Sequence, residues 1–294
     1  MNTLKPRRQH EAPIVTQWVP DRSIDPGRHE DRYKGTRKKP WEYQCEAVIP
    51  CLDSVDALPL IVSLLRLQTV RPYIVIIDTG STPENFAKVE ELRNNDVEVH
   101  SLRFGSVRHP SDFPAIAMDL AFAMCRTEFM FTTHADVFPR SRTLIERFMA
   151  KCNQHHPAVG YRMTERKHPD WQRVVSHTAS VFHMPTMDEI GAGWNLRRLC
   201  RLKGIEHAPN SMFENYPDTE LLLSEILWKN GYEGVFMGDE VNKVPTIDEN
   251  IYHCRSLTCA KLYAPAYAAQ CQQWLETAKD EAMRNVLKWS GEQL

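Results

Sequence analysis

Residues 74–81 read Ile-Val-Ile-Ile-Asp-Thr-Gly-Ser, and residues 128–137 read Glu-Phe-Met-Phe-Thr-Thr-His-Ala-Asp-Val. Each stretch is an apolar run that ends in a carboxylate, Asp78 or Asp136, and such a run is typical of a buried parallel strand. In open α/β sheets, ligands bind beyond the carboxyl ends of the strands. We therefore expect Asp78 and Asp136 to lie at the same edge of a sheet, where they suit a nucleotide and its divalent metal.

The spacing of apolar residues predicts strands and helices in alternation over the first half of the chain. Expected strands cover residues 43–50, 73–78, 97–103 and 128–133, and expected helices cover 55–67, 83–94 and 115–125. This order predicts an α/β protein with a doubly wound, Rossmann-like, mainly parallel sheet flanked by helices. No Gly-rich loop follows the first strand, so a dinucleotide site is unsupported.

The second half is less regular. Strands are expected at residues 158–163, 174–184 and 234–237, and helices at 141–153, 219–229 and 264–287. His177 and His183 alternate toward one face of the expected strand 174–184. A buried, hydrogen-bonded structural role is favoured over metal ligation for both.

Composition bounds the class of protein. The 294 residues are 42% hydrophobic and 25% charged, as in ordinary globular domains, and the net charge of −2 gives no sign of a nucleic-acid or membrane partner. Residues 1–40 are different, because they hold ten Lys or Arg against five acidic residues. Without an apolar run of about 18 residues or a signal-peptide pattern, we expect a cytoplasmic protein. The eight cysteines lack metal-site spacing and are expected to be buried, reduced thiols.

The order of these pieces resembles the GT-A fold of nucleotide-sugar glycosyltransferases, in particular the family-2-like group. The resemblance rests on the strand ending in Pro50, on Asp78-Thr79-Gly80-Ser81, on His134-Ala135-Asp136, on Pro217-Asp218-Thr219-Glu220-Leu221, and on Ile251-Tyr252-His253-Cys254. Together with the residue composition, it predicts a basic, largely irregular tail (1–42), a GT-A domain (43–260) and a C-terminal helical segment (261–294). Within the domain, residues 43–140 would form the nucleotide-sugar half and residues 141–260 the acceptor half.

The resemblance implies a metal-dependent, inverting transfer of a sugar from a nucleoside diphosphate sugar to an acceptor hydroxyl. A UDP-sugar is the favoured donor. The donor would be held by Pro50, Asp78, Ser81 and Asp136, and Mn²⁺ or Mg²⁺ by Asp136, His134 and His253. Asp218 would act as the base that deprotonates the acceptor. The chain departs from the family pattern at His134 and Pro217, where acids are usual.

Each of these residues also has a structural interpretation. Asp136 could cap a local turn or helix, Asp78 could close a turn after its strand, and Asp218 could be the N-cap of the helix that follows. His253 could be a packed or surface histidine. The sequence leaves both interpretations open.

The acceptor is suggested by Trp171, Trp194, Arg197 and Arg198, because arginines and interleaved aromatics hold phosphates and stack bases. With the basic tail, they make DNA a candidate acceptor. The chain also resembles phage-type transferases that glycosylate hydroxymethylated bases in DNA, which would place it in the host cytoplasm. A saccharide acceptor is the alternative, because an aromatic platform also suits a sugar. In the structural interpretation, Trp194 is a core residue and the arginines form a solvated helix face.

Two other function classes compete with glycosyl transfer. A nucleotidyltransferase shares the α/β layout and the metal-bound nucleotide, but usually starts with a Gly-rich loop after the first strand. A non-catalytic module that binds a nucleotide sugar is also compatible with the replaced acids at positions 134 and 217. The presence of both Asp136 and Asp218 favours an active enzyme.

Overall fold

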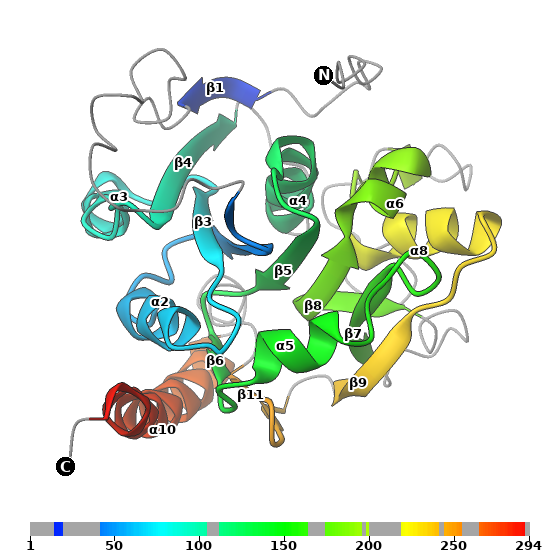
Figure 1. Cartoon of the computed structure of the whole chain (residues 1–294). Helices are drawn as coiled ribbons and strands as arrows, with labels where there is room; N and C mark the ends of the chain where they lie inside the picture. Colours follow the sequence, from blue (N-terminus) through cyan, green and yellow to red (C-terminus); the bar gives the residue numbers. More distant parts are fainter. Residues whose placement is uncertain are drawn as a thin grey trace.

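The computed structural model describes residues 15–19, 42–104, 112–163, 174–195, 198–199, 219–240, 244–254 and 265–291. A central eight-stranded sheet in the order β1-β4-β3-β2-β5-β8-β7-β9 organises them (Figure 1). Its core is four parallel strands, β2 (Cys45–Cys51), β3 (Tyr73–Asp78), β4 (Val97–Phe104) and β5 (Phe129–Thr133). The predicted α/β class with a mainly parallel sheet is confirmed.

The sheet is extended on both sides of this parallel core. On one side, β1 (Val15–Val19) pairs antiparallel with β4. On the other, β8 (Val175–His183) pairs antiparallel with β5 and with β7 (Ala158–Met163), and β9 (Val235–Glu240) pairs parallel with β7. The strand β1 lies within the segment that was expected to be largely irregular, and the sequence pattern did not predict it.

A second, three-stranded antiparallel sheet lies beside the first. It has the order β10-β11-β6, with β6 at Val137–Pro139, β10 at Thr246–Ile247 and β11 at Ile251–His253. Because β6 directly follows the end of β5, this small sheet brings a late segment of the chain to the carboxyl end of the parallel core. His253 stands opposite Val137 in the register.

Helices cover both faces of the main sheet, as a doubly wound sheet requires. One face packs against α2 (Leu58–Arg66), α3 (Pro83–Glu90), α5 (Leu144–Met149) and α10 (Pro265–Ser290), and the other against α4 (Asp112–Met124), α6 (Met184–Glu189) and α8 (Thr219–Lys229). The strand β3 shows why. Ile74 and Ile76 pack into the core on the side of α2, and Val75 and Ile77 pack into the core on the side of α4, because successive side chains of a strand point to opposite faces.

The C-terminal helix α10 packs beside α2 and β6 at the foot of the molecule (Figure 1). Its buried residues Cys271, Leu275, Ala278 and Ala282 recur every three or four positions and form one apolar stripe. Since this stripe enters the same core as α2, the helix stabilises the main domain directly.

The described cysteines agree with the prediction of reduced thiols. Cys45, Cys51, Cys152, Cys254 and Cys271 are free and buried, and Cys125 is free and partly buried. Burial raises the pKa of the Cys51 thiol to about 12, so it is protonated at neutral pH. Among the helices in the described ranges, none has the length and apolar character that crossing a membrane requires.

Candidate active site

The carboxyl end of the parallel core is built from the ends of β2, β3 and β5. The chain leaves β5 at Thr133 and reaches β6 at Val137, so His134 and Asp136 lie on the short connection between the two sheets. The strand β11 then lies against β6, and the backbone N–H of Cys254 donates to the carbonyl oxygen of Asp136 over 3.0 Å. Backbone pairing therefore fixes His253 beside the connection.

His134, Asp136 and His253 form a cluster that could hold a metal ion. One ligand atom from each lies within 4.8 Å of the others, and Nε2 of His253 is 3.6 Å from Oδ1 of Asp136. Asp136 and His253 are buried, and His134 is half-buried. Two imidazoles and a carboxylate at this spacing fit one divalent cation. The structure thus brings together the three predicted ligands, and their role as ligands stays a prediction.

A carboxylate contacts His253 through the ring nitrogen that does not face Asp136. Oε1 of Glu240, the last residue of β9, lies 3.0 Å from Nδ1 of His253. Its other oxygen accepts a hydrogen bond of 3.2 Å from the hydroxyl of Thr178 on β8. The sequence interpretation did not include Glu240, because the strand was expected to end at Met237.

A second carboxylate–histidine pair lies against His134. Nδ1 of His177 is 2.5 Å from Oε1 of Glu220 in the first turn of α8, and both side chains are buried. The rings of His177 and His134 are 4.3 Å apart between centroids. The buried, hydrogen-bonded arrangement expected for His177 is present. His183 likewise contacts the hydroxyl of Thr186 over 2.8 Å, at the start of α6.

Asp78 is fully buried at the end of β3, and both of its carboxylate oxygens have protein partners. It accepts hydrogen bonds from the backbone N–H of Ser81, from the hydroxyl of Ser101, and from Arg103 over 2.8 Å. These contacts match the turn-closing interpretation of Asp78. Its predicted contact with a nucleotide stays a prediction, and the structure adds Arg103 as a cation at this edge.

The loops after β2 and β3 are tied together. The N–H and the hydroxyl of Thr79 both donate to the carbonyl oxygen of Cys51, the residue after Pro50, over 2.8 and 2.9 Å. The hydroxyl of Ser81 accepts from the N–H of Asp53 over 2.8 Å. Asp53 has a φ of 51°, a conformation that aspartate tolerates better than most residues. Backbone near Pro50 and Ser81 is therefore held in a defined shape at the predicted nucleotide side.

The predicted acceptor residues are only partly placed. Trp194 is fully buried and packs edge-on against Phe122 and Phe182, so the expectation that its ring offers a face to an acceptor does not agree with the structure. Arg198 donates to the carbonyl oxygen of Gly191 over 3.2 Å. Trp171, Arg197 and the predicted base Asp218 lie outside the described residues.

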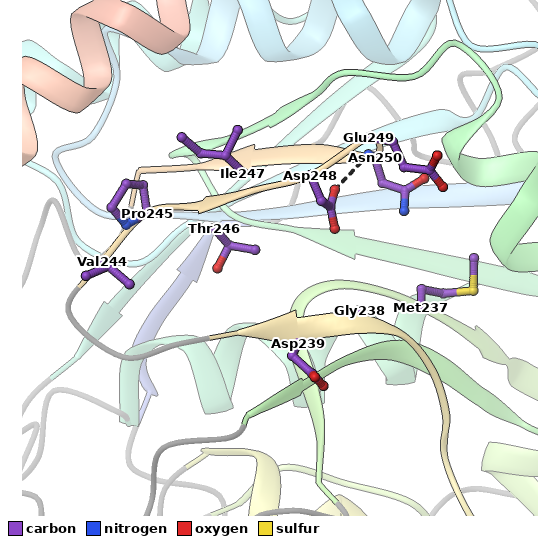
Figure 2. A pocket seen from close by; sticks show the side chains of 10 residues that line it. All are labelled: Met237, Gly238, Asp239, Val244, Pro245, Thr246, Ile247, Asp248, Glu249 and Asn250. Carbon is purple, nitrogen blue, oxygen red and sulfur yellow. Dashed lines mark hydrogen bonds between the residues drawn. The ribbon is translucent and has the colours of Figure 1, made fainter.

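A groove of about 470 Å³ lies between β9 and β10 (Figure 2). Its lining includes two aspartates that are already engaged. Asp239 pairs with Arg162, and Asp248 accepts from the hydroxyl of Tyr161 and from the N–H of Asn250. The groove does not include His134, Asp136 or His253 in its lining, so it is separate from the metal-ligand cluster.

Comparison with solved structures finds glycosyltransferases at low sequence identity. The structure of S. aureus TarS 1–349 is 14% identical, with 84% of this chain and 72% of that chain covered and a TM-score of 0.47. The mannosyltransferase PcManGT from Pyrobaculum calidifontis in complex with GDP-Man and Mn²⁺ is 15% identical, with coverage of 86% and 77% and a TM-score of 0.45. S. aureus TarS 1–349 in complex with UDP is 15% identical, with 52% of this chain and 50% of that chain covered and a TM-score of 0.40. The match therefore spans half of that chain.

Comparison with curated proteins gives no match. The family model described as glycosyl transferase family 2 matches residues 46–217, which is more than half of the chain. The matched segment starts in β2 and includes Asp78, His134 and Asp136. Its α/β architecture agrees with the GT-A fold that the resemblance implied. The chain therefore belongs to glycosyl transferase family 2.

Proposed function

We propose that this protein transfers a sugar from a nucleoside diphosphate sugar, with a UDP-sugar as the expected donor, to an acceptor hydroxyl. The observation that carries the proposal is the cluster of His134, Asp136 and His253, whose ligand atoms lie within 4.8 Å of one another. It lies at the carboxyl end of a parallel sheet, where α/β proteins bind ligands.

The donor set favours Mn²⁺ over Mg²⁺. Magnesium prefers oxygen ligands and keeps several waters, whereas manganese accepts imidazole more readily. A divalent cation held by these residues would stabilise the negative charge that develops on the diphosphate leaving group. Asp136 would supply the carboxylate, and the two histidines would supply nitrogen ligands.

The nucleotide side of the site is supported by the two loops that are tied together after β2 and β3. Backbone groups near Pro50 and Cys51 would face the base, and Asp78 and Ser81 would lie near the ribose. Arg103, which is 34% exposed, pairs with the buried Asp78 and offsets its negative charge at the proposed nucleotide side. A base and a diphosphate need such a mixture of backbone and cationic contacts.

Asp218 is the proposed base. An inverting transfer requires a carboxylate that takes the proton of the acceptor hydroxyl as this hydroxyl attacks the sugar. Asp218 directly precedes Thr219, the first residue of α8. Glu220, two residues after Asp218, contacts His177, and the ring of His177 lies against that of His134. This chain of contacts supports a base close to the metal ligands.

The acceptor stays open between a saccharide and DNA. Trp194 lies in the core and therefore offers its ring neither to a base nor to a sugar. DNA carrying hydroxymethylated bases is kept as the competing acceptor in the test, together with the basic N-terminal segment that suggested it. The family assignment speaks against a nucleotidyltransferase.

The test measures release of nucleoside diphosphate from a panel of UDP- and GDP-sugars, with Mn²⁺ or Mg²⁺, by the wild type and by D136A. Oligosaccharides and hydroxymethylated DNA are supplied as acceptors. Release that requires Mn²⁺ and is lost in D136A supports the proposal, and the acceptor that accelerates it identifies the class. Donor binding without any transfer would support the non-catalytic alternative, and release by D136A at the wild-type rate would overturn the role of Asp136.

A further inference from the structure

We infer that Glu240 is a positioning residue for the metal, because it sets the orientation and the tautomer of His253. The inference rests on the proposed function, since it concerns the same three-residue cluster. Glu240 and His253 are 13 residues apart in the chain and meet across two different sheets. The contact therefore comes from the tertiary fold.

One ring nitrogen of His253 faces the carboxylate of Glu240, and the other faces the carboxylate of Asp136. Nδ1 of His253 lies 3.0 Å from Oε1 of Glu240, and Nε2 lies 3.6 Å from Oδ1 of Asp136. We assign Nδ1–H of His253 as the donor to Glu240, because an ionised carboxylate only accepts hydrogen bonds. In a neutral imidazole this leaves the lone pair on Nε2, the nitrogen that faces Asp136.

Glu240 is itself held on its far side. Its Oε2 accepts from the hydroxyl of Thr178, and that hydroxyl accepts from the hydroxyl of Ser176 over 2.8 Å. The side chain of Glu240 is 0% exposed, and Thr178 and Ser176 are also buried. A chain of hydrogen bonds thus runs from β8 through Glu240 to the histidine and fixes the direction in which the histidine points.

The arrangement has a defined chemical consequence. A carboxylate behind a ligating imidazole raises the basicity of the ligand and limits its rotation, and loss of such a partner costs about 10–100-fold in metal affinity. The effect should be larger for Mn²⁺ than for Mg²⁺, because Mn²⁺ accepts imidazole nitrogen more readily. Glu240 would therefore contribute to the choice of metal as well as to affinity.

The neighbouring residue provides a matched control. Asp239 precedes Glu240 on β9 and points to the other face of the strand, where its exposed carboxylate pairs with Arg162. D239N and E240Q each remove one negative charge from the same strand. Only E240Q changes the group that faces His253.

The experiment measures binding of Mn²⁺ alone to the full chain by the electron paramagnetic resonance signal of free Mn²⁺, and of Mg²⁺ by competition. We expect E240Q to weaken Mn²⁺ binding by at least about tenfold, with a smaller loss for Mg²⁺, and D239N to bind as the wild type does. Thr178→Val, which removes one hydrogen bond to Glu240, should weaken Mn²⁺ binding by about threefold. Thermal unfolding without metal checks that each variant is folded.

The outcomes separate the inference from the proposed function. A wild type that binds no Mn²⁺ would overturn the metal site of the proposed function. If the wild type binds Mn²⁺ and E240Q binds it equally well, the positioning role alone is overturned. The same holds if E240Q loses affinity for Mn²⁺ and for Mg²⁺ to the same degree. If E240Q does not fold, T178V decides, because unchanged Mn²⁺ affinity in that variant contradicts the inference.

Discussion

The two ends of the parallel sheet each bury a cluster of ionisable side chains, and they balance their charges differently. Near the amino ends of the strands, Arg126 binds Glu46 over 3.0 Å and Glu98 over 2.7 Å, and His100 lies 2.5 Å from Glu98. At the carboxyl end, Asp136 lies beside the imidazoles of His134 and His253, with Glu240 behind the latter.

The pKa shifts describe the balance at the amino end. Burial lowers the pKa of Arg126, but the charges of Glu46 and Glu98 outweigh burial and raise it above its usual value. Burial raises the pKa of Glu98, yet the hydrogen bond from His100 and the charge of Arg126 bring it below its usual value. Burial dominates for Glu46, whose pKa is raised. This cluster carries its own cation.

The carboxyl end gathers carboxylates and imidazoles, which are the side chains that bind metal ions. We read the difference as a division of roles, in which the cluster around Arg126 is balanced within the protein and the cluster of His134, Asp136 and His253 is suited to an external cation. Perturbing the first cluster should therefore change stability, and perturbing the second should change binding and transfer.

The largest expected effect is that of Asp136→Ala on transfer. The variant loses the carboxylate among the three proposed metal ligands, so we expect Mn²⁺ binding and sugar transfer to fall below detection, with the fold retained. Isothermal titration with Mn²⁺ and an assay of nucleoside diphosphate release check this. Full activity would remove Asp136 from the mechanism.

Asp218→Asn sharpens the comparison, because it separates chemistry from metal binding. General-base catalysis is worth about 10²–10⁴-fold in rate, and we expect a loss of kcat in that range. Affinity for Mn²⁺ and for the donor should stay at the wild-type level. A variant with unchanged kcat would leave Asp218 with only the role of a helix cap.

At the other end of the sheet, Arg126→Gln should act on stability alone. It leaves Glu46 and Glu98 buried without their cation, which costs about 3–5 kcal/mol in the free energy of unfolding. Urea unfolding measures the loss. As a control, Arg162→Gln breaks an exposed pair with Asp239 and should cost about 1 kcal/mol or less. A loss of Mn²⁺ affinity in folded Arg126→Gln would contradict the division between the two ends.

The smallest effect concerns pH. The pKa of Glu98 is lowered in the folded state, so the unfolded chain binds more protons as pH falls. Its contribution to stability is present above the usual carboxyl pKa of 4.5 and is lost as pH falls through the lowered value. Glu98→Gln should therefore flatten the rise in stability from acid toward pH 5, measured by urea unfolding at several pH values. A slope equal to that of the wild type would contradict this linkage.

Much of the fold follows from local sequence pattern. The bounds of β3, β7 and α8 coincide with the predicted residues 73–78, 158–163 and 219–229, because continuous apolar runs and helical spacing mark buried elements clearly. The sequence pattern does not indicate β1, since it is a short strand between polar segments and it pairs with the distant β4. Pairing between segments so far apart in the sequence leaves no periodic pattern of apolar residues.

The site shows the same limit. His134, Asp136 and His253 could be named from motif order, and the structure brings them together. Glu240 could not, because its contact with His253 depends on how two sheets meet. Trp194 is open in the sequence between an acceptor surface and the core, because an arginine-rich segment with aromatics looks alike whether the ring is buried or exposed. Only packing against Phe122 and Phe182 distinguishes the two.

The measurement that tests the central claim most directly is thermal unfolding of the wild type and of D136A with Mn²⁺, with UDP, and with both. A ligand that binds only the folded state adds about 2.7 kcal/mol of stability at 100 times its Kd. We predict a rise in Tm with Mn²⁺ and UDP together that exceeds the rises with either alone in the wild type, and no such rise in D136A. Equal shifts in both proteins, or none in the wild type, would contradict a metal–nucleotide site at the carboxyl end of the sheet.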